Sequence, residues 1–145
     1  MPEEITVIAA INAARVMSGL APLQVDDRLT RAARNHATDM SQHPGMYHTG
    51  SDGSDGGDRI QACGYNWSEW EEVIGWEYGE AERMVGWWLR SPDHEPRLMS
   101  QTMTHIGAGH IFRPGSMWLH YWVVSFATGD TSASTAYIPV ALSGG

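Results

Sequence analysis

Apolar residues in the first forty positions recur at the three- and four-residue spacing of an amphipathic helix. Acidic residues open the first pattern, Glu3 to Met17, and Gly19 follows its end, as helix start and stop signals do. The second pattern follows Asp26 or Asp27, either of which can cap a helix, and its stripe is Leu29, Ala32, Ala33, His36, Ala37 and Met40. Two helices are therefore predicted, and we expect His36 to be a packed, hydrogen-bonded core residue.

The chain beyond residue 70 carries a strand pattern and then another helical pattern. Glu71 to Trp76 fits a short strand. Gly79 to Arg90 fits a helix, and its predicted buried face consists of Met84, Val85, Trp87 and Trp88. Ser91-Pro92 ends this helix, because proline cannot continue the backbone hydrogen-bond ladder and restricts the residue before it.

Two further strands are predicted at Thr104 to Phe112 and Trp118 to Phe126, around a turn at 113–116. Both faces of the second strand are apolar, which is typical of a central strand covered on two sides. Helices, a loop, a helix and then an antiparallel hairpin indicate an α+β fold with a sheet between helical layers. The domain is expected to span 1–128, and 129–145 to be a Ser/Thr/Gly-rich tail with Tyr137 to Leu142 as its candidate strand.

The segment from His43 to Asp58 is rich in glycine and aspartate and is predicted to be one long loop. Asp52, Asp55 and Asp58 recur at every third position, which raises a calcium site as a hypothesis. An EF-hand needs acids at alternate positions and a distant glutamate, so a turn-rich surface loop is the favoured interpretation. A short helix is also expected from Gly57 to Cys63.

Charge and composition exclude several classes of partner. The net charge is −8 and all nine cationic residues are dispersed arginines, so the chain lacks the basic stripe that nucleic acid or an anionic membrane needs. No apolar run approaches the roughly 20 residues of a membrane span, and the N-terminus lacks a signal-peptide pattern. Cys63 is the single cysteine, so no intrachain disulfide can form, and a buried inert thiol is expected.

Seven tryptophans lie between residues 67 and 122. Packing in the core and at its rim is their expected role, and the wall of a ligand cleft is the alternative. A divalent cation or a cationic surface is compatible with the negative charge of the chain.

A series of short motifs occurs along the chain in the order of a known family. They are Ile11-Asn12-Ala13-Ala14-Arg15, Gly19-Leu20-Ala21-Pro22-Leu23, His48-Thr49-Gly50-Ser51-Asp52-Gly53, Asp58-Arg59-Ile60, Glu72-Val73-Ile74, Trp88 through His94, Ile106-Gly107-Ala108-Gly109 and Tyr121-Trp122-x-x-x-Phe126. The chain resembles the CAP superfamily of cysteine-rich secretory, antigen 5 and pathogenesis-related proteins, most closely its compact bacterial branch without disulfides. The resemblance covers residues 3 to 128 and implies an α-β-α sandwich with a surface cleft.

In that superfamily two histidines and one or two acids line the cleft, and they bind zinc or another divalent metal in some members. The resemblance places His48, Glu72 and His94 at the matching positions, with Glu71 as a register alternative for Glu72. Val73 stands where the family has asparagine, and the second family acid has no clear counterpart. Two imidazoles and one carboxylate supply three zinc ligands and leave an open position for water.

Three functions are compatible with these residues. The first is an extracellular or surface binding module whose cleft holds a metal and a small-molecule or lipid ligand, since some members of the superfamily bind lipids or sterols. The second is an interaction domain of a cell-surface or virus-particle assembly, in which the histidines bond the carboxylate and pin two loops without metal. The third is a metal-dependent hydrolase, for which the chain lacks an HExxH helix and a nucleophile elbow, so binding is favoured over catalysis.

Overall fold

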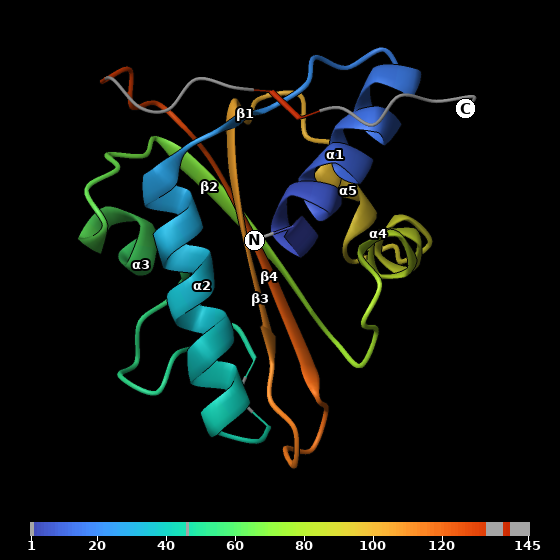
Figure 1. The fold of residues 1–145 in the computed structure, drawn as a ribbon. Coiled ribbons are helices and arrows are strands. Elements are labelled where there is room, and N and C mark those ends of the chain that lie inside the picture. Colours follow the sequence, from blue (N-terminus) through green and yellow to red (C-terminus); the bar gives the residue numbers. More distant parts are fainter. Residues whose placement is uncertain (1, 46, 133–137, 140–145) are drawn as a thin grey trace.

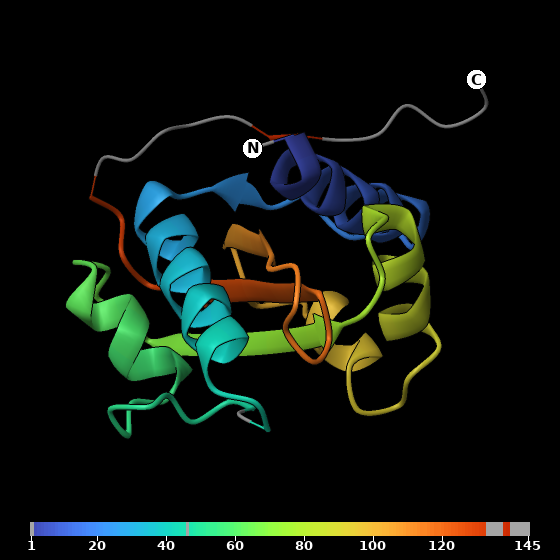
Figure 2. The ribbon, with the colours of Figure 1, turned by 60° about the horizontal axis from the view of Figure 1, so that its bottom comes forward.

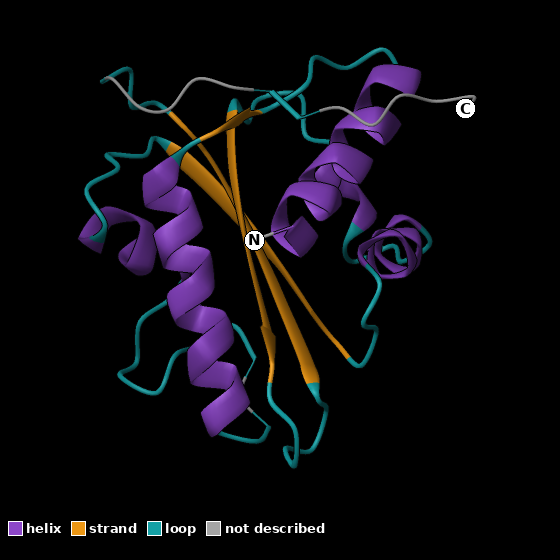
Figure 3. Ribbon diagram, viewed as in Figure 1, coloured by secondary structure: helices purple, strands orange, loops and turns teal. Residues whose placement is uncertain are grey.

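A four-stranded sheet separates two layers of helices, which confirms the expected α-β-α sandwich (Figures 1 and 2). The computed structural model describes residues 2–45, 47–132 and 138–139. In chain order the elements are α1 (Pro2–Met17), β1 (Gln24–Val25), α2 (Asp27–Gln42), α3 (Gly56–Ala62), β2 (Glu69–Trp76), α4 (Ala81–Leu89), α5 (Glu95–Leu98), β3 (His105–Phe112) and β4 (His120–Thr128). α2 and α3 cover one face of the sheet, and α1, α4 and α5 cover the other (Figure 3).

The strands are ordered β1-β3-β4-β2, so β4 lies inside the sheet. β1 pairs with β3 in parallel, and β4 pairs antiparallel with both β3 and β2, which places Glu72 opposite Ser125. Residues 121–127 of β4 are all buried, as the apolar pattern on both faces predicts. The side chains that pack with α1 and α4 are Trp122, Val124 and Phe126, and those that pack with α2 are Tyr121 and Val123.

α2 packs directly on β3 because glycine stands twice at the contact. A Cβ atom at Gly107 would lie 2.2 Å from the backbone nitrogen of Thr30, and one at Gly109 would lie 2.6 Å from the Cα of Arg34. Backbone atoms of a buried helix cannot move aside to accept such contacts. The two glycines therefore set how closely α2 approaches the sheet.

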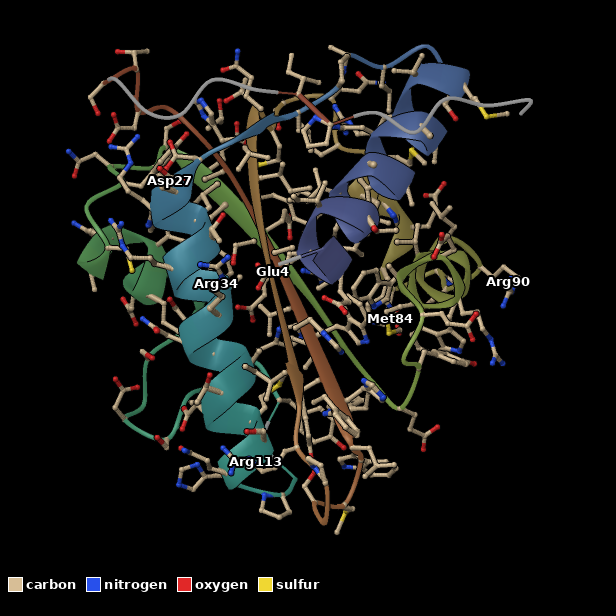
Figure 4. All side chains as sticks on the ribbon, viewed as in Figure 1. Glu4, Asp27, Arg34, Met84, Arg90 and Arg113 are labelled. Carbon is tan, nitrogen blue, oxygen red and sulfur yellow. The ribbon has the colours of Figure 1, made fainter. Side chains whose placement is uncertain are left out.

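The two helical layers are joined at the β1 edge of the sheet by an ion pair. Figure 4 shows Glu4 on α1 and Arg34 on α2 on either side of this edge. The Arg34 guanidinium donates from Nη2 at 2.6 Å and from Nε at 3.0 Å to the carboxylate of Glu4, which is 4% exposed. Glu4, Arg34 and Ala108 line one hollow, at the part of β3 that the two-residue β1 is too short to pair with.

Two buried side chains hold the α4–α5 region against the rest of the domain. The indole Nε1 of Trp88 donates to the carbonyl oxygen of Ile74 at 2.9 Å, which fastens α4 to β2. The Arg15 guanidinium donates to the carbonyl oxygens of Leu98 and Ser100 at 2.9 and 2.7 Å, which fastens the end of α5 to α1. The chain between these anchors, which includes His94, is therefore held at both ends.

Several predicted elements are confirmed with small shifts in their ends. α1, α2, β2, α4 and the β3–β4 hairpin all occur, and Asp26 is the residue that caps α2, accepting from the backbone N–H of Arg28. His36 is 1% exposed and hydrogen-bonded, as expected of a core histidine. None of the described helices is long and apolar enough to cross a membrane.

Other expectations were wrong or incomplete. The loop predicted to reach Asp58 ends at Asp55, because Asp55 and Asp58 form a capping box that starts α3. Trp87 was expected in the core but is 41% exposed, since it faces the cleft described below. The two-residue β1 and four-residue α5 are too short to show a period in the sequence. Most of the candidate strand at Tyr137 to Leu142 lies outside the described residues, and the thiol expected to be buried, Cys63, is half-buried.

Candidate functional site

A cleft with a volume of about 390 Å³ opens where the end of β2 meets α4 and two loops. Its floor is formed by the end of β2, and one side by the loop that follows α2. α4, the start of α5 and the β3–β4 hairpin complete it. The lining residues are Tyr47, His48, Ile74, Gly75, Trp76, Glu77, Tyr78, Met84, Trp87, His94 and Trp118.

His48 is oriented by a buried carboxylate. Its Nδ1 lies 2.8 Å from Oε1 of Glu72, and its side chain is 51% exposed. A carboxylate only accepts hydrogen bonds, so Nδ1 carries the proton and donates it to Glu72. In the neutral ring the lone pair on Nε2 is then available to a ligand or a metal.

Both carboxylate oxygens of Glu72 accept hydrogen bonds. Its second oxygen, Oε2, accepts from Nη2 of Arg59 at 2.7 Å, and the carboxylate is 2% exposed. The same Nη2 donates to the backbone oxygen of His48 at 2.9 Å, so Arg59 ties the histidine loop to α3. Burial raises the pKa of Glu72, but the hydrogen bond from His48 and the charge of Arg59 outweigh burial and hold that pKa below its ordinary value.

The neighbouring acid, Glu71, has a different role. Its Oε1 accepts from Nη1 of Arg97 at 2.8 Å, and both side chains are partly exposed. Of the two register alternatives, Glu72 is therefore the one that contacts His48. Neither acid is among the residues that line the cleft.

His94 lines the same cleft from the segment between α4 and α5. Its Nδ1 lies 2.7 Å from Oγ of Ser91, and its ring packs against that of Trp87 with centroids 5.1 Å apart. Burial lowers the pKa of His94, and the positive charges of Arg97 and His48 lower it further against the opposing effect of Asp93. The lowered pKa favours the neutral ring, which is the form that binds metals.

The donor set differs from the three-ligand set expected from the sequence. His48 and His94 both reach the cleft, but Glu72 is turned toward His48 and Arg59. Within the described residues no three His, Cys, Asp or Glu side chains are placed to hold one ion. The arrangement fits two imidazole ligands with a carboxylate behind one of them, as is common around metal-bound histidines.

Aromatic side chains form the rest of the cleft wall. The rings of Tyr47 and Trp76 meet edge to face at 5.1 Å, and Trp76 lies 6.2 Å from Trp118. The buried His36 supports this wall, because its Nε2 donates to the backbone oxygen of Tyr47 at 2.6 Å. Part of the tryptophan content thus belongs to a cleft wall, which the sequence left as the alternative to packing.

Two contributors to the site were not predicted. Arg59 was noted only within a motif, and nothing in its local sequence identifies Glu72 as its partner. Glu77 follows the end of the strand and carried no motif at all. Both depend on contacts between segments that are distant along the chain.

The aspartates of the loop after α2 are used by the backbone. Asp52 accepts from the backbone N–H of Ser54 at 3.0 Å, and Asp55 and Asp58 cap α3. These bonds explain their spacing as turn and cap chemistry. The calcium hypothesis has no support from their placement.

His110 and His120 lie on β3 and β4 and are not among the residues that line the cleft, although the backbone oxygen of His120 accepts from the backbone N–H of Glu77 at 3.1 Å. Nε2 of His110 and Nδ1 of His120 are 2.9 Å apart, and the ring of His110 stacks on that of Trp122. His105 bonds to the hydroxyl of Tyr65 at 2.8 Å, and His43 bonds to Asp39 at the end of α2. All four have the packing or surface roles expected of them.

Sequence comparison decides the family. The model of the Cysteine-rich secretory protein family, CAP, matches residues 8–126, which is most of the chain. The chain belongs to the CAP family. A Bacillus subtilis relative, "Uncharacterized protein YkwD", is 28% identical over 117 residues, which are 81% of this chain and 45% of the relative. This CAP domain thus spans less than half of that protein.

Solved CAP structures share the fold at low sequence identity. An outer surface protein from Borrelia burgdorferi superposes with a TM-score of 0.77 at 24% identity, covering 84% of this chain and 89% of that one. An extracellular SCP-domain protein from Bacillus anthracis gives 0.79 at 20% identity, covering 88% of this chain and 41% of that one. At these identities the likeness establishes the fold, and function has to be argued from the site.

Proposed function

We propose that this CAP domain is a binding module whose cleft holds a divalent metal, zinc in particular, between His48 and His94. The contact between His48 Nδ1 and Glu72 supports the proposal most, because it leaves Nε2 for an ion. Glu72 and Arg59 then act as orienting groups behind the ligand. When bound, the ion would polarise an oxygen atom of a molecule in the cleft.

The rest of the cleft suits an organic ligand, small or lipidic. Its walls are mostly aromatic and apolar, and its volume of about 390 Å³ is that of a small-molecule pocket. An extracellular or cell-surface location is part of the proposal. It is supported by the names of two structural relatives, an outer surface protein and an extracellular protein.

Calorimetry with zinc chloride near pH 7.5 tests the metal site. We expect one ion per chain with a dissociation constant in the micromolar range, lost in the His48→Ala/His94→Ala double variant. His43→Ala is the matched control, because His43 is an exposed histidine at the end of α2 that does not line the cleft. Absence of binding to the wild type, or binding that survives the double substitution, would show that the two histidines are structural.

That negative result would favour a second candidate, an interaction domain within a larger assembly. Exposed apolar side chains gather on the β3–β4 hairpin, where Phe112 is 55%, Met117 65% and Leu119 45% exposed. A group of exposed large apolar residues is typical of a surface that contacts another protein. In this candidate the cleft has no ligand, and the bond from His48 to Glu72 serves only to pin its loop.

A further inference from the structure

Glu77 has a backbone conformation that disfavours its side chain. Its φ angle is 77°, in the left-handed region, and Leu119 at 67° is the other non-glycine residue with a positive φ in the described ranges. Glycine adopts this conformation without steric cost, so a glutamate here lowers stability relative to glycine. The Glu77 side chain is exposed, so core packing does not offset that cost.

Glu77 also supplies the formal charge of the cleft. Among the described residues that line the cleft it is the one carboxylate, and none of them is an arginine. The same cleft is lined by the aromatic residues Trp76, Trp87, Trp118 and Tyr47. An electron-rich ring face attracts a cation, and a carboxylate beside it adds a direct charge interaction.

One aromatic residue of this cleft already holds a cation. The guanidinium carbon of Arg83 lies 4.9 Å from the centroid of the Tyr78 ring, although Arg83 itself does not line the cleft. The ring of Tyr78 is therefore not counted among those available to a ligand. In the described part of the chain, the arginines that lie over an aromatic ring are Arg28, over Tyr65, and Arg83, over Tyr78, so the cleft tryptophans and Tyr47 have no arginine over their rings.

We propose that the Glu77 end of the cleft binds a small organic cation, a quaternary ammonium group, between aromatic faces and the Glu77 carboxylate. The net charge of −8 favours the approach of such a ligand, and weakly hydrated quaternary ammonium groups are the cations that aromatic sites recognise. The proposal rests on the proposed role of the cleft as a ligand site but does not need the metal.

The cation site and the histidine pair lie in the same cleft but use different groups. Glu77 lines the cleft at the end of β2, whereas His48 and His94 line it from two other segments. The ring of Trp87 packs against that of His94, so an ion at the histidines can affect a cation held on that ring. Choline binding is therefore measured in protein freed of metal by a chelator, and zinc binding is measured without choline, so that either can fail without the other.

Choline is the probe, and 3,3-dimethylbutan-1-ol is its uncharged counterpart of the same shape. Tryptophan fluorescence and calorimetry should show saturable choline binding that is about tenfold tighter than binding of the alcohol. Glu77→Gln should lose about tenfold in choline affinity. Glu80→Gln, which removes an exposed acid that does not line the cleft, should bind as the wild type does.

Glu77→Gly separates binding from folding. Because glycine relieves the left-handed strain, this variant should unfold at the same temperature as the wild type or higher, while losing choline affinity as Glu77→Gln does. Equal affinity for choline and the alcohol, or unchanged affinity in both Glu77 variants, would overturn the proposal. Zinc titration of the same proteins keeps a failure here distinct from a failure of the metal site.

Phosphatidylcholine vesicles identify the source of the cation. Co-sedimentation that free choline displaces would support a lipid headgroup as the ligand, and choline binding without co-sedimentation would support a soluble one. Both results uphold the recognition of a quaternary ammonium group. Absence of binding to both probes would refute it.

Discussion

Glu72→Gln is the substitution that tests the support of His48 most directly. The carboxylate is 2% exposed and receives hydrogen bonds from His48 at 2.8 Å and from Arg59 at 2.7 Å. Glutamine keeps the shape and one acceptor oxygen but presents an NH₂ group to the second donor. Arg59, 10% exposed in its side chain, then loses its charged partner.

The expected loss of unfolding free energy follows from these contacts. Breaking a buried ion pair by removing one charge costs about 3–5 kcal/mol, and the oxygen that glutamine retains moderates this to about 3 kcal/mol. For a chain of this size the loss corresponds to a fall in Tm of roughly 6–12 °C. It should appear at pH 7 in protein freed of metal by a chelator.

The loss should also depend on pH. The pKa of Glu72 is lowered in the folded protein, against the destabilising effect of burial on its charge, by the His48 hydrogen bond and the Arg59 charge. A carboxylate with a lowered pKa stabilises the fold fully above its unfolded pKa of about 4.3, and this contribution disappears as the pH falls through the folded value. The difference between wild type and variant should therefore be full at pH 7 and shrink below about pH 4.

Urea denaturation of both proteins at pH 7 and at pH 3 measures the effect. Glu71→Gln is the matched control, because Glu71 is the adjacent acid and its ion pair with Arg97 is 37% and 42% exposed. Exposed pairs contribute little, so this control should stay within about 1 kcal/mol of the wild type. A Glu72→Gln protein as stable as the control at pH 7, or a difference that does not change with pH, would refute the reasoning.

Two further substitutions test the scaffold. Gly109→Ala should lower the unfolding free energy by about 3 kcal/mol, because its Cβ would lie 2.6 Å from the backbone of α2. Gly86→Ala, on the outside of α4, is the control and should be neutral or stabilising. Thermal melts that show equal losses for the two variants would contradict this. Asp55→Ala should cost about 1 kcal/mol through loss of the α3 cap, measured by urea denaturation. Asp52→Ala is its control, since Asp52 accepts one exposed turn bond, and an equal loss in both would argue against the cap.

The elements of the sandwich are largely encoded locally. The apolar stripe of α2 and the two apolar faces of β4 are visible in the sequence, because each period follows from the geometry of a single helix or strand. β1, with two residues, and α5, with four, span only about one period each, so neither shows a repeating pattern. Trp87 was misplaced because the helical period identifies a face of α4 but not whether the sheet or a cleft lies beside it.

The site was only partly predictable for a different reason. Family motifs drew attention to His48, Glu72 and His94, and the hypothesis without metal paired both histidines with the carboxylate. The structure has that bond for His48, whereas His94 bonds Ser91. Glu72 meets a histidine 24 residues earlier in the chain and an arginine 13 residues earlier, and no local pattern encodes either contact. The direction of a buried carboxylate is decided by which donors surround it.

The sequence by itself determined the sandwich, its central strand, the core position of His36 and the segments that carry the two cleft histidines. Only the tertiary structure decided that Glu72 accepts a hydrogen bond from the proton-bearing Nδ1 of His48 and forms an ion pair with Arg59. It also decided that Glu77 has a strained backbone conformation in a cleft lined by aromatic rings. Periodicity records which residues an element buries. Hydrogen bonds between distant segments, and the cleft they surround, exist only after those elements have packed together.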